Sequence, residues 1–129
     1  CYPIPGDAIL GYVSAGRGIV IHRRTCKNVA EFKTHPEKWV DVEWGGDIDV
    51  EFPVAIRLEA INRRGALATI AAAVAKEDAN IEFVGMSERD EGSAGLSLVV
   101  VVRDRRHLAR VIRSVRTTQP VSRVVRLKG

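Results

Sequence analysis

The chain has 129 residues, of which 46% are hydrophobic and 28% are charged. These proportions are ordinary for a globular protein, and they exclude a disordered chain, a collagen-like chain and a disulfide-rich mini-protein. No apolar run reaches the roughly 18 residues of a membrane-spanning helix, so we expect no membrane span. The formal net charge is +4, and residues 103–129 hold nine Lys or Arg against a single Asp. This basic end favours a polyanionic partner, with a solvated surface as the alternative.

Composition along the chain indicates two domains. The sequence starts at Cys1, and its single methionine is Met86, so we expect a piece of a longer protein. A glycine pair followed by two aspartates, within residues 45–49, is typical of a junction. We therefore predict domains at residues 1–45 and 46–129. A unit as small as the first would need a metal ion or a neighbouring domain to help it fold.

The first domain is predicted to be small and rich in β-structure. The prolines and the glycine of residues 2–7 predict a turn-rich opening segment. Strands are expected at 9–13 and 19–21, a short helix at 27–32 and a half-buried strand at 39–44. The two tryptophans of the last strand are expected in the core, with base stacking as the alternative.

The second domain has a clearer pattern. Alternation predicts a strand at 50–60 with Val50 on its buried face, and helical spacing of apolar residues predicts a helix over 67–74. The remaining elements are a strand at 81–88, a turn at 89–93, a strand at 96–102, a helix capped by Asp104 and a last strand at 121–127. The order βαββαβ predicts an α+β fold, a ferredoxin-like sheet with both helices on one face.

Three residues form the only set that would suit a metal ion: Cys1, His22 and Cys26. His22 and Cys26 are four positions apart and would share one face of a helical turn. Structural zinc prefers four ligands, so the fourth would precede Cys1 or be Asp7. The alternative is two reduced cysteines and a surface histidine. A Cys1–Cys26 disulfide is disfavoured in a cytosolic protein.

The loop at residues 62–65 is a candidate ligand site because it leads from the first strand of the second domain into a helix. A helix N-terminus offers unpaired N–H groups and a partial positive charge, which suit a carboxylate. Gly65 would let the backbone approach a ligand, and Asn62 would hydrogen-bond its charged ends. The alternative is that Asn62 only caps the helix and Gly65 only turns the chain.

Basic residues in two places predict contacts with RNA phosphates. One group surrounds a turn of the first domain, and the other recurs at i, i+4 and i+7 on the second helix of the second domain. The predicted RNA-contact residues are Arg17, Arg23, Arg24, Lys27, Arg106, Arg110 and Arg113. A solvated helix face is the alternative. No combination of nucleophile, base and acid predicts catalysis, and His35 and His107 are expected at the surface.

The first domain carries a motif that is specific to one family. It comprises residues 1–7, the Gly16-Arg17-Gly18 turn, His22 and Arg23 with Cys26 and Asn28, and residues 36–39 and 42–44. With it, the chain resembles the C-terminal regulatory region of the RelA/SpoT (Rel) enzymes, which make and degrade (p)ppGpp in the bacterial stringent response. The first domain resembles the family's conserved-cysteine module, also called its zinc-finger or ribosome-intersubunit domain. The other domain resembles the family's ACT domain, with residues 61–67 as the ligand loop.

This resemblance implies partners and a metal. The synthetase and hydrolase domains would lie upstream in the same chain, so this cytoplasmic fragment would not itself be catalytic. The family's cysteine motif begins with two adjacent cysteines, of which Cys1 would be the second, and zinc is the expected metal. The region would dock on the ribosome and touch ribosomal RNA when an uncharged tRNA occupies the A site.

The resemblance also implies an effector, because ACT domains commonly bind amino acids, often at a dimer interface. A homodimer is therefore expected, with valine, leucine or isoleucine as the ligand of a small apolar pocket. The predicted ligand-binding residues are Asn62, Arg63, Arg64, Gly65, Ala66, Leu67, Ile81 and Met86. Three roles stay open: an amino-acid sensor that tunes the synthetase/hydrolase balance, a ribosome-docking module and a dimerisation module.

Overall fold

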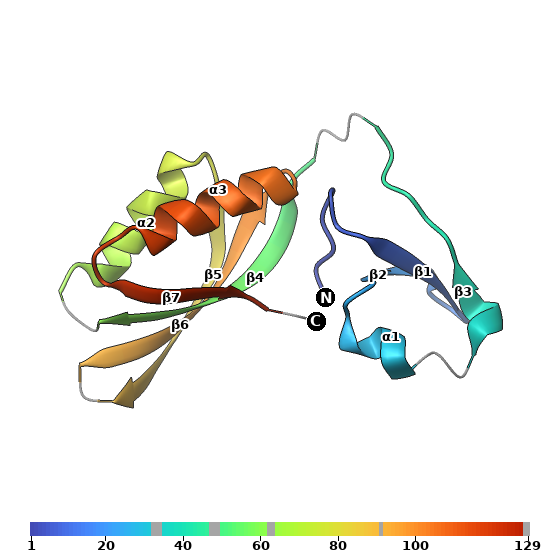
Figure 1. Ribbon diagram of the computed structural model, residues 1–129, viewed down its shortest axis with the longest axis horizontal. Helices are drawn as coiled ribbons and strands as arrows, with labels where there is room; N and C mark the ends of the chain where they lie inside the picture. Colours follow the sequence, from blue (N-terminus) through green and yellow to red (C-terminus); the bar gives the residue numbers. More distant parts are fainter. Residues whose placement is uncertain (32–34, 47–49, 62–63, 91, 128–129) are drawn as a thin grey trace.

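The computed structural model describes residues 1–31, 35–46, 50–61, 64–90 and 92–127. Two sheets that share no strand divide the chain into a first and a second half (Figure 1). The first half contains β1 (Ile9–Ser14), β2 (Gly18–Arg23), α1 (Lys27–Glu31), the 3-10 helix η2 (Pro36–Lys38) and β3 (Trp39–Val40). The second half contains β4 (Phe52–Ile61), α2 (Ala66–Lys76), β5 (Asn80–Asp90), β6 (Ser93–Val102), α3 (Arg105–Arg116) and β7 (Val121–Arg126). Within these described ranges, no helix is both long and apolar enough to cross a bilayer.

The first half is built on a small antiparallel sheet with the strand order β2-β1-β3. β1 and β2 form a hairpin whose register runs from the Ile9–Arg23 pair to the Ser14–Gly18 pair. Gly16 and Gly18 at the turn have φ values of 87° and 75°, in the left-handed region that glycine adopts without steric cost. The two predicted strands are therefore confirmed, and both extend slightly beyond the predicted ranges.

β3 is shorter than predicted. It pairs with β1 only through Trp39 and Val40, whereas the alternation predicted a strand that continued to Trp44. The Trp44 indole instead donates a hydrogen bond from Nε1 to the Asp7 carbonyl oxygen at 3.0 Å. Its ring also packs edge-on against Phe52 of β4, with 5.7 Å between the centroids. Trp44 is therefore half-buried by one contact within the first half and one with the second half. A period-two pattern does not distinguish such burial from pairing in a sheet.

The second half confirms the predicted ferredoxin-like α+β fold. Its sheet has the order β5-β6-β4-β7 with antiparallel neighbours, and both α2 and α3 lie on one face (Figure 1). Because successive side chains of a strand alternate between faces, β4 buries every second residue beneath the helices. These residues are Val54, Ile56, Leu58 and Ala60. The prediction for Val50 is wrong: it is 56% exposed, because β4 begins only at Phe52.

His107, which was predicted at the surface, is only 1% exposed. Its backbone N–H donates to the Asp104 carboxylate at 2.8 Å, so the predicted cap of α3 is confirmed. Its ring Nδ1 accepts a hydrogen bond from the Arg103 N–H at 3.0 Å. The ring Nε2 donates to the Glu77 carbonyl oxygen at 2.6 Å. The neutral ring with its proton on Nε2 thus joins the end of α2 to the start of α3.

Candidate functional sites

A small pocket opens where β4 leads into α2. Its volume is about 240 Å³, which is below the roughly 300–1,000 Å³ of pockets for drug-sized molecules. It is lined by Ala60, Ile61, Gly65, Ala66, Leu67, Ala68, Met86, Ala94 and Leu96. None of these residues has a polar side chain, so the pocket suits a small aliphatic group.

The start of α2 supplies the polar part of this site. Gly65 precedes the helix with a φ of 82°, a turn that would strain a residue bearing a Cβ. Its carbonyl oxygen accepts hydrogen bonds from both the N–H and the hydroxyl of Thr69 at 2.9 Å. The N–H groups of the first turn have no acceptor within the helix. With the helix dipole, they would attract a carboxylate at the mouth of the pocket.

The structure brings together four of the predicted ligand-binding residues. The lining includes Gly65, Ala66, Leu67 and Met86. Ile81 lies elsewhere: its strand position pairs with Val100 and its side chain packs against the core, which corrects the prediction. Arg64 is exposed and does not line the pocket. Asn62 and Arg63 lie outside the described residues.

Sequence reasoning missed the floor of the pocket. Ala60 of β4 and Ala94 of β6 face each other across the sheet, and Leu96 lies two residues further along β6. Both alanines occupy buried positions of strands whose larger buried side chains are Val, Leu and Ile. Interiors are close-packed, so small side chains at such positions leave space. Alanine on the buried face of a strand, next to a predicted ligand loop, was the available signal.

The predicted metal ligands Cys1, His22 and Cys26 are also brought together. Their ligand atoms all lie within 4.8 Å of one another, and both cysteines are free thiols. The distance from Cys1 Sγ to His22 Nδ1 is 3.7 Å, close to the about 3.5 Å expected between sulfur and nitrogen around tetrahedral zinc. Burial lowers the pKa of His22, which favours the neutral, ligating imidazole at neutral pH. The three donors fit a zinc ion that takes a fourth ligand from elsewhere.

Asp7 is not available as that fourth ligand, which corrects one alternative from the sequence. Its two carboxylate oxygens accept hydrogen bonds of 2.9 and 2.7 Å from the Arg126 guanidinium, and one also accepts from the Ile4 N–H at 3.0 Å. Burial raises the pKa of Asp7, but the hydrogen bonds from Arg126 and Ile4 outweigh this and hold the pKa below its ordinary value. Asp7 therefore stays an anion that joins the first half to β7.

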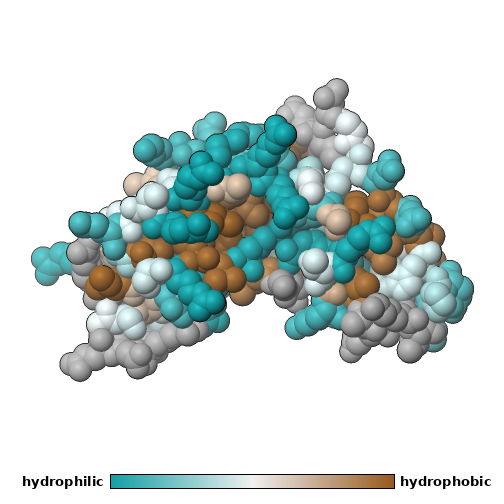
Figure 2. Space-filling model, viewed as in Figure 1, coloured by the Kyte–Doolittle hydropathy of each residue, from teal (hydrophilic) through white to brown (hydrophobic). Residues whose placement is uncertain are grey.

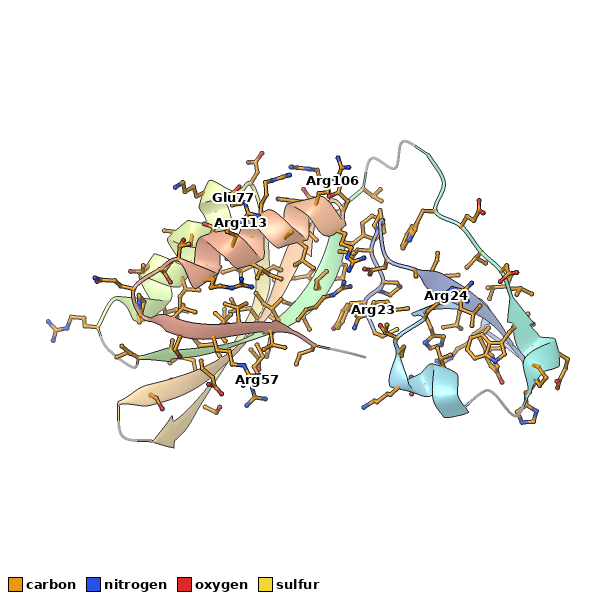
Figure 3. All side chains as sticks on the ribbon, in the orientation of Figure 1. Arg23, Arg24, Arg57, Glu77, Arg106 and Arg113 are labelled. Atoms are coloured by element: carbon orange, nitrogen blue, oxygen red, sulfur yellow. The ribbon has the colours of Figure 1, made fainter. Side chains whose placement is uncertain are left out.

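Arg23 does not fit its predicted role as an RNA contact. The residue is only 6% exposed, and its guanidinium donates a hydrogen bond of 2.7 Å to the Leu127 carbonyl oxygen. Figure 3 shows Arg23 at the boundary between the two halves, whereas Arg24 lies within the first half. Its charge is therefore used inside the molecule and is not offered to a phosphate.

The other predicted RNA-contact residues are exposed. They are Arg17, Arg24, Lys27, Arg106, Arg110 and Arg113. Hydrophilic side chains cover much of α3 in the view of Figure 2. Arg24 lies 3.4 Å from Asp41, and Arg110 lies 4.0 Å from Glu77. Ion pairs that are exposed or partly exposed, like these, are weak, so the arginines would readily bind another anion in place of the carboxylate.

Two families match the sequence in succession, the RelA/SpoT RIS domain over residues 1–45 and the ACT domain over residues 49–126. The chain belongs to the RelA/SpoT family. Its first half is accordingly called the RIS domain and its second half the ACT domain, and together they match the family's C-terminal regulatory region. The resemblance read from the motif of the first domain is thereby confirmed.

Relatives and a solved structure agree with this placement. The bifunctional (p)ppGpp synthase/hydrolase SpoT of Escherichia coli is 38% identical over 98% of this chain, and the GTP pyrophosphokinase of the same organism is 33% identical over all of it. The chain spans only 18% of the length of each relative. The crystal structure of the ACT domain from the GTP pyrophosphokinase of Chlorobium tepidum is 26% identical, with a TM-score of 0.52. That match covers 60% of this chain and 99% of the solved chain.

Proposed function

We propose that this region regulates a bifunctional (p)ppGpp synthetase/hydrolase by binding an amino acid in the ACT pocket. The pocket itself is the observation that carries the proposal, because it joins an apolar, alanine-lined space to a helix N-terminus. The cytoplasmic parent chain would hold both catalytic domains upstream, and this region would not be catalytic. The effector would shift the balance of synthesis and hydrolysis by the difference between its affinities for the two states.

A branched-chain amino acid is the ligand that this geometry suits best. Its carboxylate would lie at the start of α2, and its side chain would enter the space beside Ala60 and Ala94. The lining offers no charged partner for a longer basic or acidic side chain. We therefore propose valine, leucine or isoleucine, with lysine as the expected non-ligand.

Replacing Met86 by glutamate is expected to weaken binding of the amino acid at least about tenfold, or about 1.4 kcal/mol. The new carboxylate would repel that of the ligand and remove an apolar contact. Isothermal titration calorimetry with valine, leucine, isoleucine and lysine measures the change. Phe83→Glu is the matched control: Met86 and Phe83 are both 58% exposed on β5, but only Met86 lines the pocket. Asn62→Ala tests the loop and is expected to abolish binding.

Two results would contradict the sensor proposal. One is the absence of heat with any amino acid at protein concentrations well above the expected dissociation constant. The other is equal loss of affinity in Met86→Glu and Phe83→Glu, which would place the ligand outside this pocket. The same samples, examined by sedimentation with and without ligand, test the expected homodimer.

A second proposed function is docking to ribosomal RNA, which fits a stalled ribosome with an uncharged tRNA. The observation that favours it is the exposed arginine row of α3, together with the match to the RIS domain. Guanidinium groups bind phosphate oxygens in a two-pronged geometry that lysine does not reproduce. This surface lies on α3, which contributes no residue to the pocket at the start of α2, so RNA and an amino acid would bind at different places.

Arg113→Gln is expected to weaken RNA binding and to lower the salt slope of the binding constant by about one. The reason is that one phosphate contact, with its released counterion, is lost. Arg57→Gln is the control, because Figure 3 shows Arg57 on the sheet side, away from α3. Fluorescence anisotropy with a labelled ribosomal RNA fragment at several salt concentrations gives both quantities. An unchanged slope in Arg113→Gln, or the same change in Arg57→Gln, would count against this surface.

A further inference from the structure

Residues 2–7, here called the strap, belong to the RIS domain in sequence but are held by the ACT domain. Ile4 is fully buried within the ACT core. The Pro5 carbonyl oxygen accepts a hydrogen bond of 2.8 Å from the backbone N–H of Arg105, the first residue of α3. A Cβ on Gly6 would lie only 2.8 Å from the Cβ of Arg105, so the strap and α3 are tightly packed. At the far end of the strap, Asp7 forms the buried ion pair with Arg126 of β7.

The near end of the strap adjoins the cysteine cluster. Cys1 Sγ lies 3.7 Å from His22 Nδ1 and accepts a hydrogen bond from the Arg23 N–H at 3.4 Å. The Arg23 side chain in turn reaches the Leu127 carbonyl oxygen just after β7. Only two residues separate Cys1 from Ile4, a reach of at most about 11 Å. The position of the thiol and the docking of the strap are therefore linked by a short piece of chain.

A metal ion would strengthen this link in both directions. Thiol hydrogen bonds are weak, so the cluster by itself holds Cys1 loosely. Bonds from zinc to sulfur and nitrogen are short, and structural zinc prefers a tetrahedral arrangement of its ligands. A bound ion would therefore hold the sulfur at one position. A docked strap already presents the sulfur near that position. Thermodynamic linkage then requires two equal effects: docking of the strap raises the metal affinity by the same factor as metal binding raises the equilibrium constant for docking.

We propose that metal binding at Cys1, His22 and Cys26 is coupled to docking of the ACT domain on the strap. Breaking the Asp7–Arg126 ion pair then lowers metal affinity, although neither residue is a ligand. Residues that position metal ligands typically change affinity by about 10–100-fold when mutated. We expect the lower end, about tenfold, because Arg126 acts through several residues of chain. The proposal does not depend on the amino-acid pocket or on RNA binding.

Cobalt(II) titration of the 129-residue chain tests the coupling, because thiolate-bound cobalt has characteristic absorption bands. Wild-type protein is expected to show them, and Cys26→Ser to keep only the part of their intensity that Cys1 supplies. Arg126→Gln is expected to bind cobalt about tenfold more weakly. Competition with zinc then gives the zinc affinity. Arg116→Gln is the matched control, because Arg116 is an exposed arginine at the end of α3. It is expected to bind cobalt as the wild type does.

A second measurement needs no variant. In wild-type protein, zinc is expected to slow hydrogen exchange of the Arg105 amide, which is bonded to Pro5, relative to protein treated with a chelator. Unchanged exchange would overturn the proposal. Equal cobalt affinity of Arg126→Gln and wild type would also overturn it, as would the absence of thiolate bands in the wild type.

Discussion

Asp7→Asn is expected to lower the free energy of unfolding by about 3 kcal/mol at pH 7, because breaking a buried ion pair leaves an uncompensated charge. The side chains of Asp7 and Arg126 are only 6% and 17% exposed, and their oxygen and nitrogen approach to 2.7 Å. Asparagine keeps the acceptor for the Ile4 N–H but not the charge that faces Arg126 and Arg23. Urea unfolding of both proteins measures the difference.

The same pair predicts a dependence on pH. The pKa of Asp7 is lower in the folded protein than its unfolded value of 3.8. Its contribution to stability is therefore fully present above about pH 4 and is lost as the pH falls through the folded pKa. The stability difference between wild type and Asp7→Asn is expected to be constant from pH 7 to pH 5 and to shrink towards pH 3.

Asp41→Asn is the matched control for this experiment. Asp41 also lies beside an arginine, at 3.4 Å from Arg24, but its side chain is 93% exposed. Exposed ion pairs contribute between zero and about 1 kcal/mol, so little change is expected. Equal effects of the two substitutions would show that the connection between the RIS and ACT domains does not depend on the buried pair.

His107→Leu is expected to lower the free energy of unfolding by about 3 kcal/mol, because two partly buried backbone groups lose their bonds to the buried ring. Leucine fills a similar space but neither accepts from the Arg103 N–H nor donates to the Glu77 carbonyl oxygen. Each unsatisfied buried group costs about 1–3 kcal/mol. Thermal and urea unfolding both measure the loss.

His35→Leu is the control, because the His35 side chain is 55% exposed and its contact with Glu37 lies at the surface. A change of no more than about 0.5 kcal/mol is expected there. If His107→Leu were as stable as the wild type, water would have to hydrogen-bond the Arg103 N–H and the Glu77 carbonyl oxygen in place of the ring. The ring would then fill space but would not join α2 to α3.

The secondary structure of the ACT domain was predictable because local patterns agree with the tertiary fold there. β4 and β6 are central strands beneath two helices, so their period-two alternation follows burial directly. The Asp104 cap is a contact over three positions and is visible in a short window. Local patterns no longer predicted the structure where a segment packs against a distant element. Trp44 is an example, because it contacts Asp7 and Phe52.

For the candidate sites, too, local features could be predicted and contacts between distant segments could not. Residue type alone identified the cysteine cluster, because thiol and imidazole groups are rare in this chain and suit zinc. The pocket was predicted only at its rim: the loop and the start of α2 are local features, whereas Ala60 meets Ala94 through the register of β4 and β6. Met86 joins them from the neighbouring strand β5.

The sequence by itself determined the order of elements, the position of the candidate ligand loop and the set of metal-capable side chains. Only the tertiary structure decided which polar residues are buried: Arg23 bonds to a carbonyl 104 positions away, and His107 to one 30 positions away. Composition shows that a charge is present but not where its partner lies. Whether a charged or polar side chain is solvated or buried depends on contacts between distant segments, which no local pattern records.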